Sequence, residues 1–155
     1  MEEAEDAHEI MGLIIRTISE TKRLARGFYP IELERHGLFP ALKELAINTE
    51  KMFHVVCECH WDSSVKIENQ TVESHLYRIV QEAIHNAIKH GKAKRIQVSV
   101  VRKEDDHVLL SVQNDGVGIA HVSPAMIGMG LRTMEYRTKM INASLKIEKR
   151  PEGGT

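Results

Sequence analysis

Several features that mark other protein classes are scarce or missing in this sequence. Cys57 and Cys59 are its only cysteines, and their spacing leaves no ordinary structural disulfide framework to build. The longest apolar run near the start, residues 11–15, is far too short to cross a bilayer. Lysine and arginine number 21 against 22 acidic residues, a net charge of −1, so no overall field attracts nucleic acid or anionic lipid. We expect a soluble, cytoplasmic protein with no nucleic-acid partner and no direct membrane contact.

The rest of the composition is that of an ordinary globular protein. Hydrophobic residues make up 42% of the chain and charged residues 28%, which argues against disordered and fibrous classes. A length of 155 residues suits one globular domain with a modest extension and is too short for two full domains.

The N-terminal segment predicts one long helix. No proline occurs from Glu2 to Phe28. A mainly apolar seam recurs at alternating spacings of three and four: Met11, Ile14, Ile18, Thr21, Ala25 and Phe28. Charged residues lie outside this seam, which favours a helix in a bundle, and a helix lying on its own domain remains an alternative. Gly27 and Pro30 end the pattern.

The remainder alternates between helical and strand patterns. The sequence predicts, in order, a connector over 29–37, a helix over 38–50, a strand over 53–61, a helix over 71–90, a hairpin of strands over 96–101 and 108–112, a helix over 131–141 and a strand over 144–149. His54, Cys57, Cys59 and His60 suggest a metal cluster, but a strand points His60 and the two cysteines to opposite faces. We therefore expect buried structural cysteines.

Polar residues on the helix over 71–90 form a stripe opposite its apolar side. Glu82, Asn86, Lys89 and His90 fall at steps of four, three and one, so a carboxylate, an amide and two potential cations share one surface. An ordinary solvated helix face explains this stripe equally well.

Two glycine motifs follow, and each is weak alone. Asp115-Gly116-x-Gly118 follows a strand directly, where a carboxylate can accept a base's amine proton while the glycines let backbone approach a ligand. A plain turn explains such a motif more often. Gly128-x-Gly130 opens a helix, and free amides at a helix N-terminus stabilise phosphate.

The order of these motifs resembles the N, G1 and G2 boxes of the histidine kinase ATPase domain. The matching segments are Gln-Glu-Ala-Ile-His-Asn-Ala-Ile-Lys-His at 81–90, Asn-Asp-Gly-Val-Gly-Ile at 114–119 and Gly-Met-Gly-Leu at 128–131. That superfamily also contains gyrase, MutL and the heat-shock chaperone ATPases. The resemblance implies a two-layer α/β sandwich, with helices covering one face of a mixed sheet and ATP held between the helices and a flexible lid over 120–127.

A second resemblance involves the segment before the first predicted connector. Leu-Ala-Arg-Gly-Phe-Tyr-Pro at 24–30, followed by Glu34-x-x-Gly37-Leu38 and Ala41-Leu42, is similar to the linker of nitrate-sensor-type sensor kinases. It implies a second dimerisation helix over 1–30 and an ATP-binding catalytic domain over 31–155. It also implies a parent protein that is a homodimer, phosphorylates a response regulator and can be anchored in a membrane with this part in the cytoplasm.

The resemblance implies a role for each matching residue. Asn86 would hold Mg²⁺ against the phosphates of ATP, and Glu82 would orient or deprotonate the attacking group. Lys89 and His90 would lie along the phosphates, and Asp115 would read the adenine amine with help from Thr155. Backbone room would come from Gly116, Gly118, Gly128 and Gly130, and the base and lid would be lined by Ile119 and Leu131.

The chain departs from the family pattern in two ways. The family's phosphoacceptor histidine precedes an acidic residue on the first dimerisation helix, whereas His8, followed by Glu9, lies at the head of the second. A final strand beyond Gly-Gly-Thr is also absent, and we expect a lower stability than in the parent domain. We predict an ATP-dependent kinase domain that phosphorylates a histidine outside this chain. The alternatives are an anti-sigma serine kinase, a chaperone-like ATPase, or a catalytically silent nucleotide-binding dimerisation module.

Overall fold

The computed structural model describes Met11, residues 31–118 and residues 128–155. The chain divides into two compact units, Met1–Ile31 and Glu32–Thr155. The predicted helix over residues 2–28 lies outside the described part except for Met11, and so does the predicted lid over 120–127. The described elements are α2 (Ile31–His36), α3 (Leu38–Phe53), β1 (Val56–Trp61), α4 (Gln70–Lys89), β2 (Arg95–Arg102), β3 (Val108–Asn114) and α5 (Met129–Met140).

The three strands form one mixed sheet in the order β1-β2-β3. β1 and β2 are parallel and are joined through α4, whereas β2 and β3 form the predicted antiparallel hairpin. Parallel strands need such a crossover connection, and a hairpin needs only a short turn. Ile96, Val98 and Val100 of β2 are almost fully buried, while the residues that alternate with them face outward or are half-buried.

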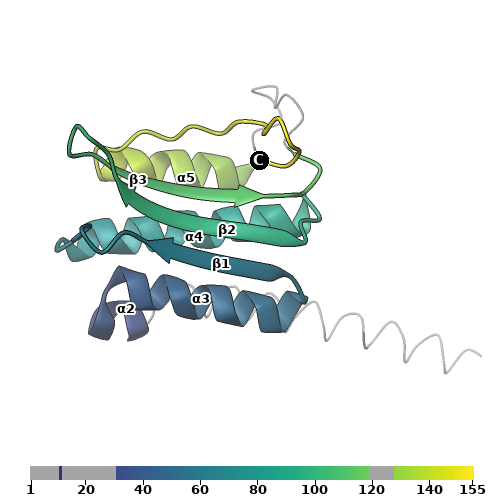
Figure 1. Cartoon of the computed structure of the whole chain (residues 1–155), viewed down its shortest axis with the longest axis horizontal. Coiled ribbons are helices and arrows are strands. Elements are labelled where there is room, and N and C mark those ends of the chain that lie inside the picture. The colour runs from purple at the N-terminus through teal and green to yellow at the C-terminus, as the bar shows by residue number, and fades with distance from the viewer. Residues whose placement is uncertain (1–10, 12–30, 119–127) are drawn as a thin grey trace, which may run out of the picture. The chain divides into compact units, whose positions relative to one another are not determined.

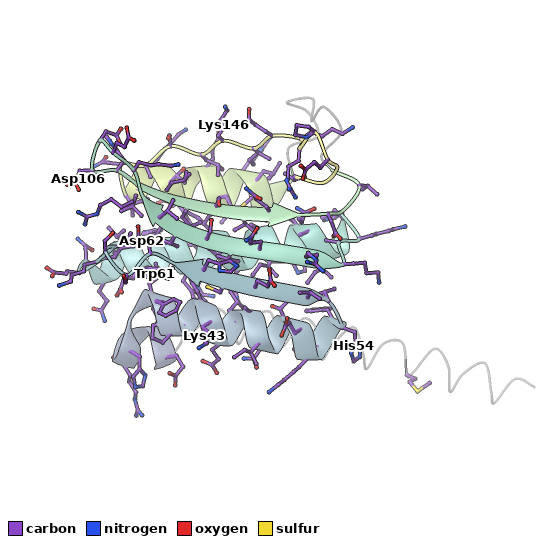
Figure 2. The ribbon with its side chains drawn as sticks, viewed as in Figure 1. Lys43, His54, Trp61, Asp62, Asp106 and Lys146 are labelled. Atoms are coloured by element: carbon purple, nitrogen blue, oxygen red, sulfur yellow. The ribbon has the colours of Figure 1, made fainter. Side chains whose placement is uncertain are left out.

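The helices lie on one side of the sheet, as Figure 1 shows for α4 and α5 behind the strands. α4 packs against β2, β3, α3 and α5, and α3 also runs along β1. Trp61, labelled in Figure 2, stands at the end of β1. Its ring lies against that of Phe39 of α3, with centroids 5.4 Å apart. The expected two-layer α/β arrangement, a mixed sheet covered by helices on one face, is confirmed.

Local hydrogen bonds define where α4 begins and ends. Asn69 caps its N-terminus, because the side chain accepts hydrogen bonds from the backbone N–H groups of Thr71 and Val72. At the other end the N–H groups of His90 and Gly91 both donate to the carbonyl of Asn86. The apolar side predicted from the sequence is buried at Ile79, Val80, Ile84 and Ala87.

Carboxylates of neighbouring helices accept hydrogen bonds from one backbone N–H of α3 and one of β1. Glu73 of α4 accepts a 2.9 Å hydrogen bond from the N–H of Leu38, which has no partner within α3. Glu50 of α3 accepts one of 2.9 Å from the N–H of Cys57, on the edge of β1 that faces away from β2. This carboxylate occupies an unpaired edge group that could otherwise recruit another strand.

The cysteines lie where the strand pattern predicts. Cys57 is buried and Cys59 is half-buried, both as free thiols, while His60 is exposed on the other face of β1. Burial, with the nearby charges of Glu50 and Cys59, raises the pKa of Cys57 to about 11. Its thiol is therefore protonated at neutral pH and contributes by packing.

Three local predictions were wrong. The connector predicted over 29–37 contains the short helix α2, and α3 continues to Phe53, where a strand was expected to begin. Residues 144–149 form no strand, although the segment is extended in Figure 1. Within the described chain, the backbone around it bonds only at its two ends, Ala143 to Thr138 and Arg150 to Gly154. A strand requires a neighbouring backbone, and the alternation of Leu145 and Ile147 alone does not supply one.

Candidate functional site

The polar stripe of α4 faces α5 at its middle and solvent at its end. Glu82 and Asn86 are half-buried, while Lys89 and His90 are exposed in the last turn. α4 and α5 pack against each other, so the half-buried pair lies at a helix–helix boundary. This placement is unlike that of an ordinary solvated helix face.

Gly130 at the start of α5 lies directly on this pair. A Cβ added to Gly130 would collide with Oε1 of Glu82 and come within 3.5 Å of Nδ2 of Asn86. The absence of a side chain therefore lets the backbone of α5 approach the carboxylate and the amide. The structure thus brings two of the sequence motifs, 81–90 and 128–131, into contact.

The N-terminus of α5 presents free backbone groups next to Glu82 and Asn86. Gly128 precedes the helix, and among the described residues no side chain caps it and no acidic residue stands in its first turn. Unpaired N–H groups and the helix dipole stabilise an anion at such an end. Gly128 is exposed and Leu131 is half-buried one turn into the helix.

Asp115 is held in one orientation by the backbone before β2. Its Oδ1 accepts hydrogen bonds of 2.8 Å from the N–H groups of both Lys94 and Arg95. The N–H of Arg95 contributes most to lowering the pKa of Asp115, followed by that of Lys94, with the charge of Arg95 adding to the effect. The side chain is therefore a fixed, exposed carboxylate at neutral pH, and Oδ2 is the oxygen that these two amides leave for another donor.

Backbone contacts join the loop after Asp115 to the end of α4. The N–H of Val117 donates to the carbonyl of Gly91 at 2.9 Å, and the N–H of Gly91 donates to the carbonyl of Asn86 at 3.1 Å. A Cβ on Gly116 would collide with the carbonyl oxygen of Gly91. Val117, two residues after Asp115, is thus connected to Asn86 through two consecutive hydrogen bonds, and Gly116 is required for this close approach.

The last residues of the chain complete this side of the site. Gly154 has a φ of +84°. A Cβ added to it would collide with the carbonyl oxygen of Asn114 and would lie 3.1 Å from Cα of Asp115. The carbonyl of Thr155 accepts a 3.0 Å hydrogen bond from the N–H of Asn114. Gly118, with a φ of +74°, faces the carbonyl of Gly154. Thr155 is therefore close to Asp115, although they are far apart in sequence.

Contacts link most of the predicted site residues to one another, directly or through chain neighbours. One group is Asp115, Gly116, Gly118 and Thr155, a second is Asn86, Lys89 and His90 at the end of α4, and a third is Glu82, Gly128, Gly130 and Leu131; Gly91 joins the first to the second, and Gly130 joins the third to Asn86. Ile119 lies outside the described residues.

The sequence analysis did not identify three residues that connect these groups. Asn114 is buried, and its Oδ1 accepts a 3.0 Å hydrogen bond from the N–H of Gly116 while its backbone binds Thr155. Gly91 and Gly154 supply the carbonyls against which the glycine motif packs. The sequence signals were a glycine directly after the helical pattern and a Gly-Gly pair at 153–154, neither of which specifies its partner.

The chain matches a family model and known proteins. Residues 71–155, more than half of the chain, match the family described as histidine kinase-, DNA gyrase B-, and HSP90-like ATPase. The oxygen sensor histidine kinase NreB of Staphylococcus carnosus is 27% identical over 152 residues, covering 97% of this chain and 44% of that protein. The sensor protein VraS of Staphylococcus aureus (strain COL) is 30% identical over 136 residues, covering 88% of this chain and 38% of its own length.

A solved structure shares the fold. The histidine kinase domain of the blue-light activated histidine kinase EL346 from Erythrobacter litoralis aligns with a TM-score of 0.62 at 18% identity. The alignment covers 73% of this chain and 55% of that domain. The three motifs in contact, the family match and the two sensor-protein relatives lead to one assignment. This chain belongs to the histidine kinase-, DNA gyrase B-, and HSP90-like ATPase family, as an ATP-binding domain of the sensor histidine kinase type.

Proposed function

We propose that this chain binds ATP with Mg²⁺ and transfers the γ-phosphoryl group to a histidine on the parent protein's dimerisation domain. The observation that carries the proposal is the contact of Gly130 with Glu82 and Asn86. It sets a helix N-terminus, a carboxylate and an amide around one space, which suits a polyphosphate with its cation. Phosphoryl transfer depends mainly on positioning and charge neutralisation, which these groups supply.

Each residue has a role in this proposal. Asp115 accepts the adenine amine at Oδ2, assisted by Thr155, and Lys89 and His90 lie along the phosphates. Gly116, Gly118 and Gly130 give the backbone room that their contacts require, Gly128 stands at the start of α5 where an added Cβ would meet nothing within 4 Å, and Ile119 and Leu131 line the base and the lid.

The donor set fits a magnesium ion bound mainly through phosphate. Asn86 offers one amide oxygen beside the carboxylate of Glu82, and hard cations in phosphate sites use few protein oxygens. When bound, the ion neutralises charge on the phosphates. Glu82 accepts the proton of the attacking imidazole, as the bond from phosphorus to the bridging oxygen of ADP breaks and the phosphorus–nitrogen bond forms.

The parent protein extends beyond this chain in the proposal. The chain spans less than half the length of the relatives NreB and VraS. We assign 1–30 to the second dimerisation helix of a homodimer, 31–155 to the catalytic domain, and the whole chain to the cytoplasm. A response regulator receives the phosphoryl group from the acceptor histidine. No described helix combines the length and apolar character needed to span a membrane.

Nucleotide titration of two aspartate variants tests the proposal. Asp115→Asn should weaken Mg·ATP binding by about tenfold to a hundredfold, because a lost charged acceptor costs about 1–3 kcal/mol in a closed site. Asp105→Asn removes the same charge from the far hairpin, where Asp105 pairs with His107, and should leave affinity unchanged. Equal affinities for the two variants, or no ATP binding by the wild type, would overturn the proposal.

A further inference from the structure

The β2–β3 hairpin ends at Asp115 with a side chain in the place of a backbone acceptor. Residues directly opposite each other in an antiparallel pair can exchange two backbone hydrogen bonds. The N–H of Asp115 donates to the carbonyl of Arg95 at 3.2 Å, but the N–H of Arg95 donates to Oδ1 of the Asp115 side chain at 2.8 Å. The carboxylate therefore replaces the carbonyl of Asp115 as the last acceptor of the ladder.

A second amide binds the same oxygen. The N–H of Lys94 also donates to Oδ1 of Asp115 at 2.8 Å, so two consecutive backbone amides, which we call the amide pair, hold one carboxylate oxygen. The segment that carries them is itself fixed by the sheet, because the carbonyl of Lys94 accepts a 2.9 Å hydrogen bond from the N–H of Val56 on β1. The two donors set the rotation of the carboxylate and leave Oδ2 for a ligand.

Charge makes Oδ2 an acceptor only. Both bonds, the one from Arg95 first, hold the pKa of Asp115 below its ordinary value, so the carboxylate is ionised at neutral pH. An ionised carboxylate accepts hydrogen bonds and donates none. A base with an exocyclic amine can donate to Oδ2, whereas a base with a carbonyl at that position would place two acceptors against each other. A carboxyl group that turned or took up a proton could bind either base.

We propose that the amide pair determines the base selectivity of the nucleotide site, because it fixes Oδ2 of Asp115 as an acceptor for an exocyclic amine. Lys94 and Arg95 are then positioning residues that act through Asp115 by their backbone, and their side chains are dispensable for this role. This inference rests on the proposed function, in which Oδ2 accepts the amine of adenine. It assigns the choice of base to the turn between α4 and β2, which lies outside the sequence motifs.

Calorimetric titration of the 155-residue chain with the Mg²⁺ complexes of ATP and ITP tests the inference, since ITP carries a carbonyl in place of the amine of ATP. The wild type should bind ATP at least about tenfold more tightly than ITP. Arg95→Pro removes the N–H of Arg95 but keeps the carbonyl that Asp115 uses, and proline is tolerated at the first residue of a strand. It should lower the ATP-to-ITP affinity ratio at least about threefold.

Arg95→Ala is the matched control. It removes the same side chain and keeps the N–H, so its affinity ratio should stay within about twofold of the wild-type ratio. Val108→Pro, at the first residue of β3 and the far end of the hairpin, introduces a proline away from Asp115 and should also keep the ratio. Equal ratios in Arg95→Pro and Arg95→Ala would overturn the inference, including the case in which Arg95→Pro lowers only the melting temperature.

Lys94→Pro repeats the test outside the strand. It removes the other N–H of the amide pair and keeps the carbonyl that binds Val56, and an unchanged ratio in this variant also contradicts the inference. Hydrogen exchange of the wild type needs no variant: ATP should slow exchange at the amides of Lys94 and Arg95 more than ITP does, and equal protection would count against the proposal. A wild type that bound ATP and ITP equally would overturn this inference alone, whereas one that bound neither would remove the proposed function as well.

Discussion

The start of α5 carries two glycines at which a methyl group would meet different surroundings. At Gly128 an added Cβ meets nothing within 4 Å, whereas at Gly130 it collides with the carboxylate of Glu82. That carboxylate is the far end of a flexible side chain and can move aside. Alanine is also a better helix former than glycine by about 1 kcal/mol. Gly130→Ala should therefore keep the fold and displace Glu82.

The expected result of Gly130→Ala is a melting temperature close to that of the wild type with a transfer rate at least about tenfold lower, because a displaced catalytic carboxylate loses its reach. Gly128→Ala is the matched control and should retain activity. Radiolabel transfer to a supplied acceptor domain, together with thermal unfolding, measures both properties. Full transfer activity in Gly130→Ala would show that the position of Glu82 is unimportant.

A titration shift at His75 is the second prediction at this scale. Arg137→Gln removes a charge that lowers the pKa of His75, so this pKa should rise towards its ordinary value of about 6.5 while burial still holds it below. Proton NMR of the imidazole, assigned with His75→Gln, measures the change. An unchanged titration would mean that Arg137 does not face His75.

The same residue predicts a pH dependence of stability. The folded pKa of His75 lies below its unfolded value, so the unfolded state binds the proton more readily as pH falls. The contribution of the neutral ring is present above about pH 6.5 and is lost as pH falls through the folded value. His75→Gln should remove this part of the pH profile of unfolding.

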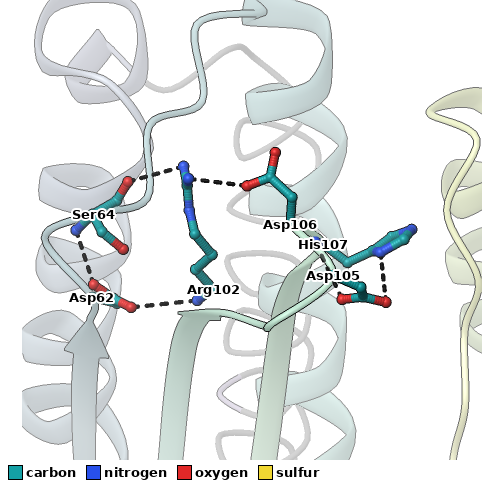
Figure 3. Close-up of polar contacts among 6 residues, drawn as sticks. All are labelled: Asp62, Ser64, Arg102, Asp105, Asp106 and His107. Atoms are coloured by element: carbon teal, nitrogen blue, oxygen red, sulfur yellow. Dashed lines mark hydrogen bonds and ion pairs between the residues drawn. The ribbon is translucent and has the colours of Figure 1, made fainter.

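At the scale of elements, Arg102 connects two loops, as Figure 3 shows. It lies at the end of β2, whereas Asp115 bonds to Arg95 at the start of that strand. Its guanidinium binds Oδ1 of Asp106 at 3.0 Å and the carbonyl of Ser64 at 3.1 Å. Its backbone N–H donates to Asp62 at 3.4 Å. The group joins the β1–α4 loop to the β2–β3 turn and contacts no residue of the proposed site.

Arg102→Ala should lower the melting temperature by no more than about 4 °C, because exposed ion pairs stabilise weakly. ATP affinity should not change, since β2 separates Arg102 from Asp115 by about 23 Å along the strand. Calorimetry and nucleotide titration measure the two effects. A marked loss of affinity would indicate that the hairpin end communicates with the nucleotide.

The loss of folding stability at acidic pH gives a further check on Arg102→Ala. Hydrogen bonds from Ser64, and then from the backbone of Arg102, lower the pKa of Asp62. Its contribution is therefore present above its unfolded pKa of about 3.9 and is lost as pH falls through the folded value. Arg102→Ala keeps that backbone N–H and the bonds from Ser64 and removes only the charge of Arg102, the smallest cause, so the acid dependence that Asp62 contributes should be nearly the same in wild type and variant.

The elements that the sequence predicts well are those whose pattern depends on burial within the element itself. α4 and the β2–β3 hairpin follow directly from their periodic apolar residues. The strand predicted over 144–149 was wrong because a strand depends on a neighbouring backbone, which no local pattern specifies. The helix α2 was not predicted because its short polar sequence between Pro30 and Gly37 gives weak periodicity.

In the candidate site, too, some residues could be predicted from the sequence and others could not. The side chains that we propose carry the chemistry are Glu82, Asn86 and Asp115, and they were identified because their types and order match known motifs. The groups that position them are mostly backbone: the amides of Lys94 and Arg95, and the carbonyls of Gly91 and Gly154. Such contacts depend on chain packing and leave little trace in residue types. The roles of all these residues remain predictions for the experiments above.

For the whole molecule, the ATP site and the acceptor must be considered together. Transfer requires the γ-phosphate and an imidazole on another helix to be held in a near-attack geometry. The sequence contains no histidine–acid pair that matches the family's acceptor, and His8 lies at the head of the segment that resembles the second dimerisation helix. The chain should therefore bind Mg·ATP and show no autophosphorylation.

Transfer to a supplied dimerisation domain should occur but be slow, because residues 1–30, which we propose form a single dimerisation helix, must first rebuild a bundle and this association carries an entropic cost. Incubation of the chain with labelled ATP, alone and with an acceptor domain, measures both expectations, and phosphohistidine is recognised as an acid-labile, base-stable product. Label on the chain alone would contradict the prediction. His8→Ala then decides its source: if that variant abolished the label, His8 would be the acceptor, and the assignment of residues 1–30 to the second dimerisation helix would be wrong.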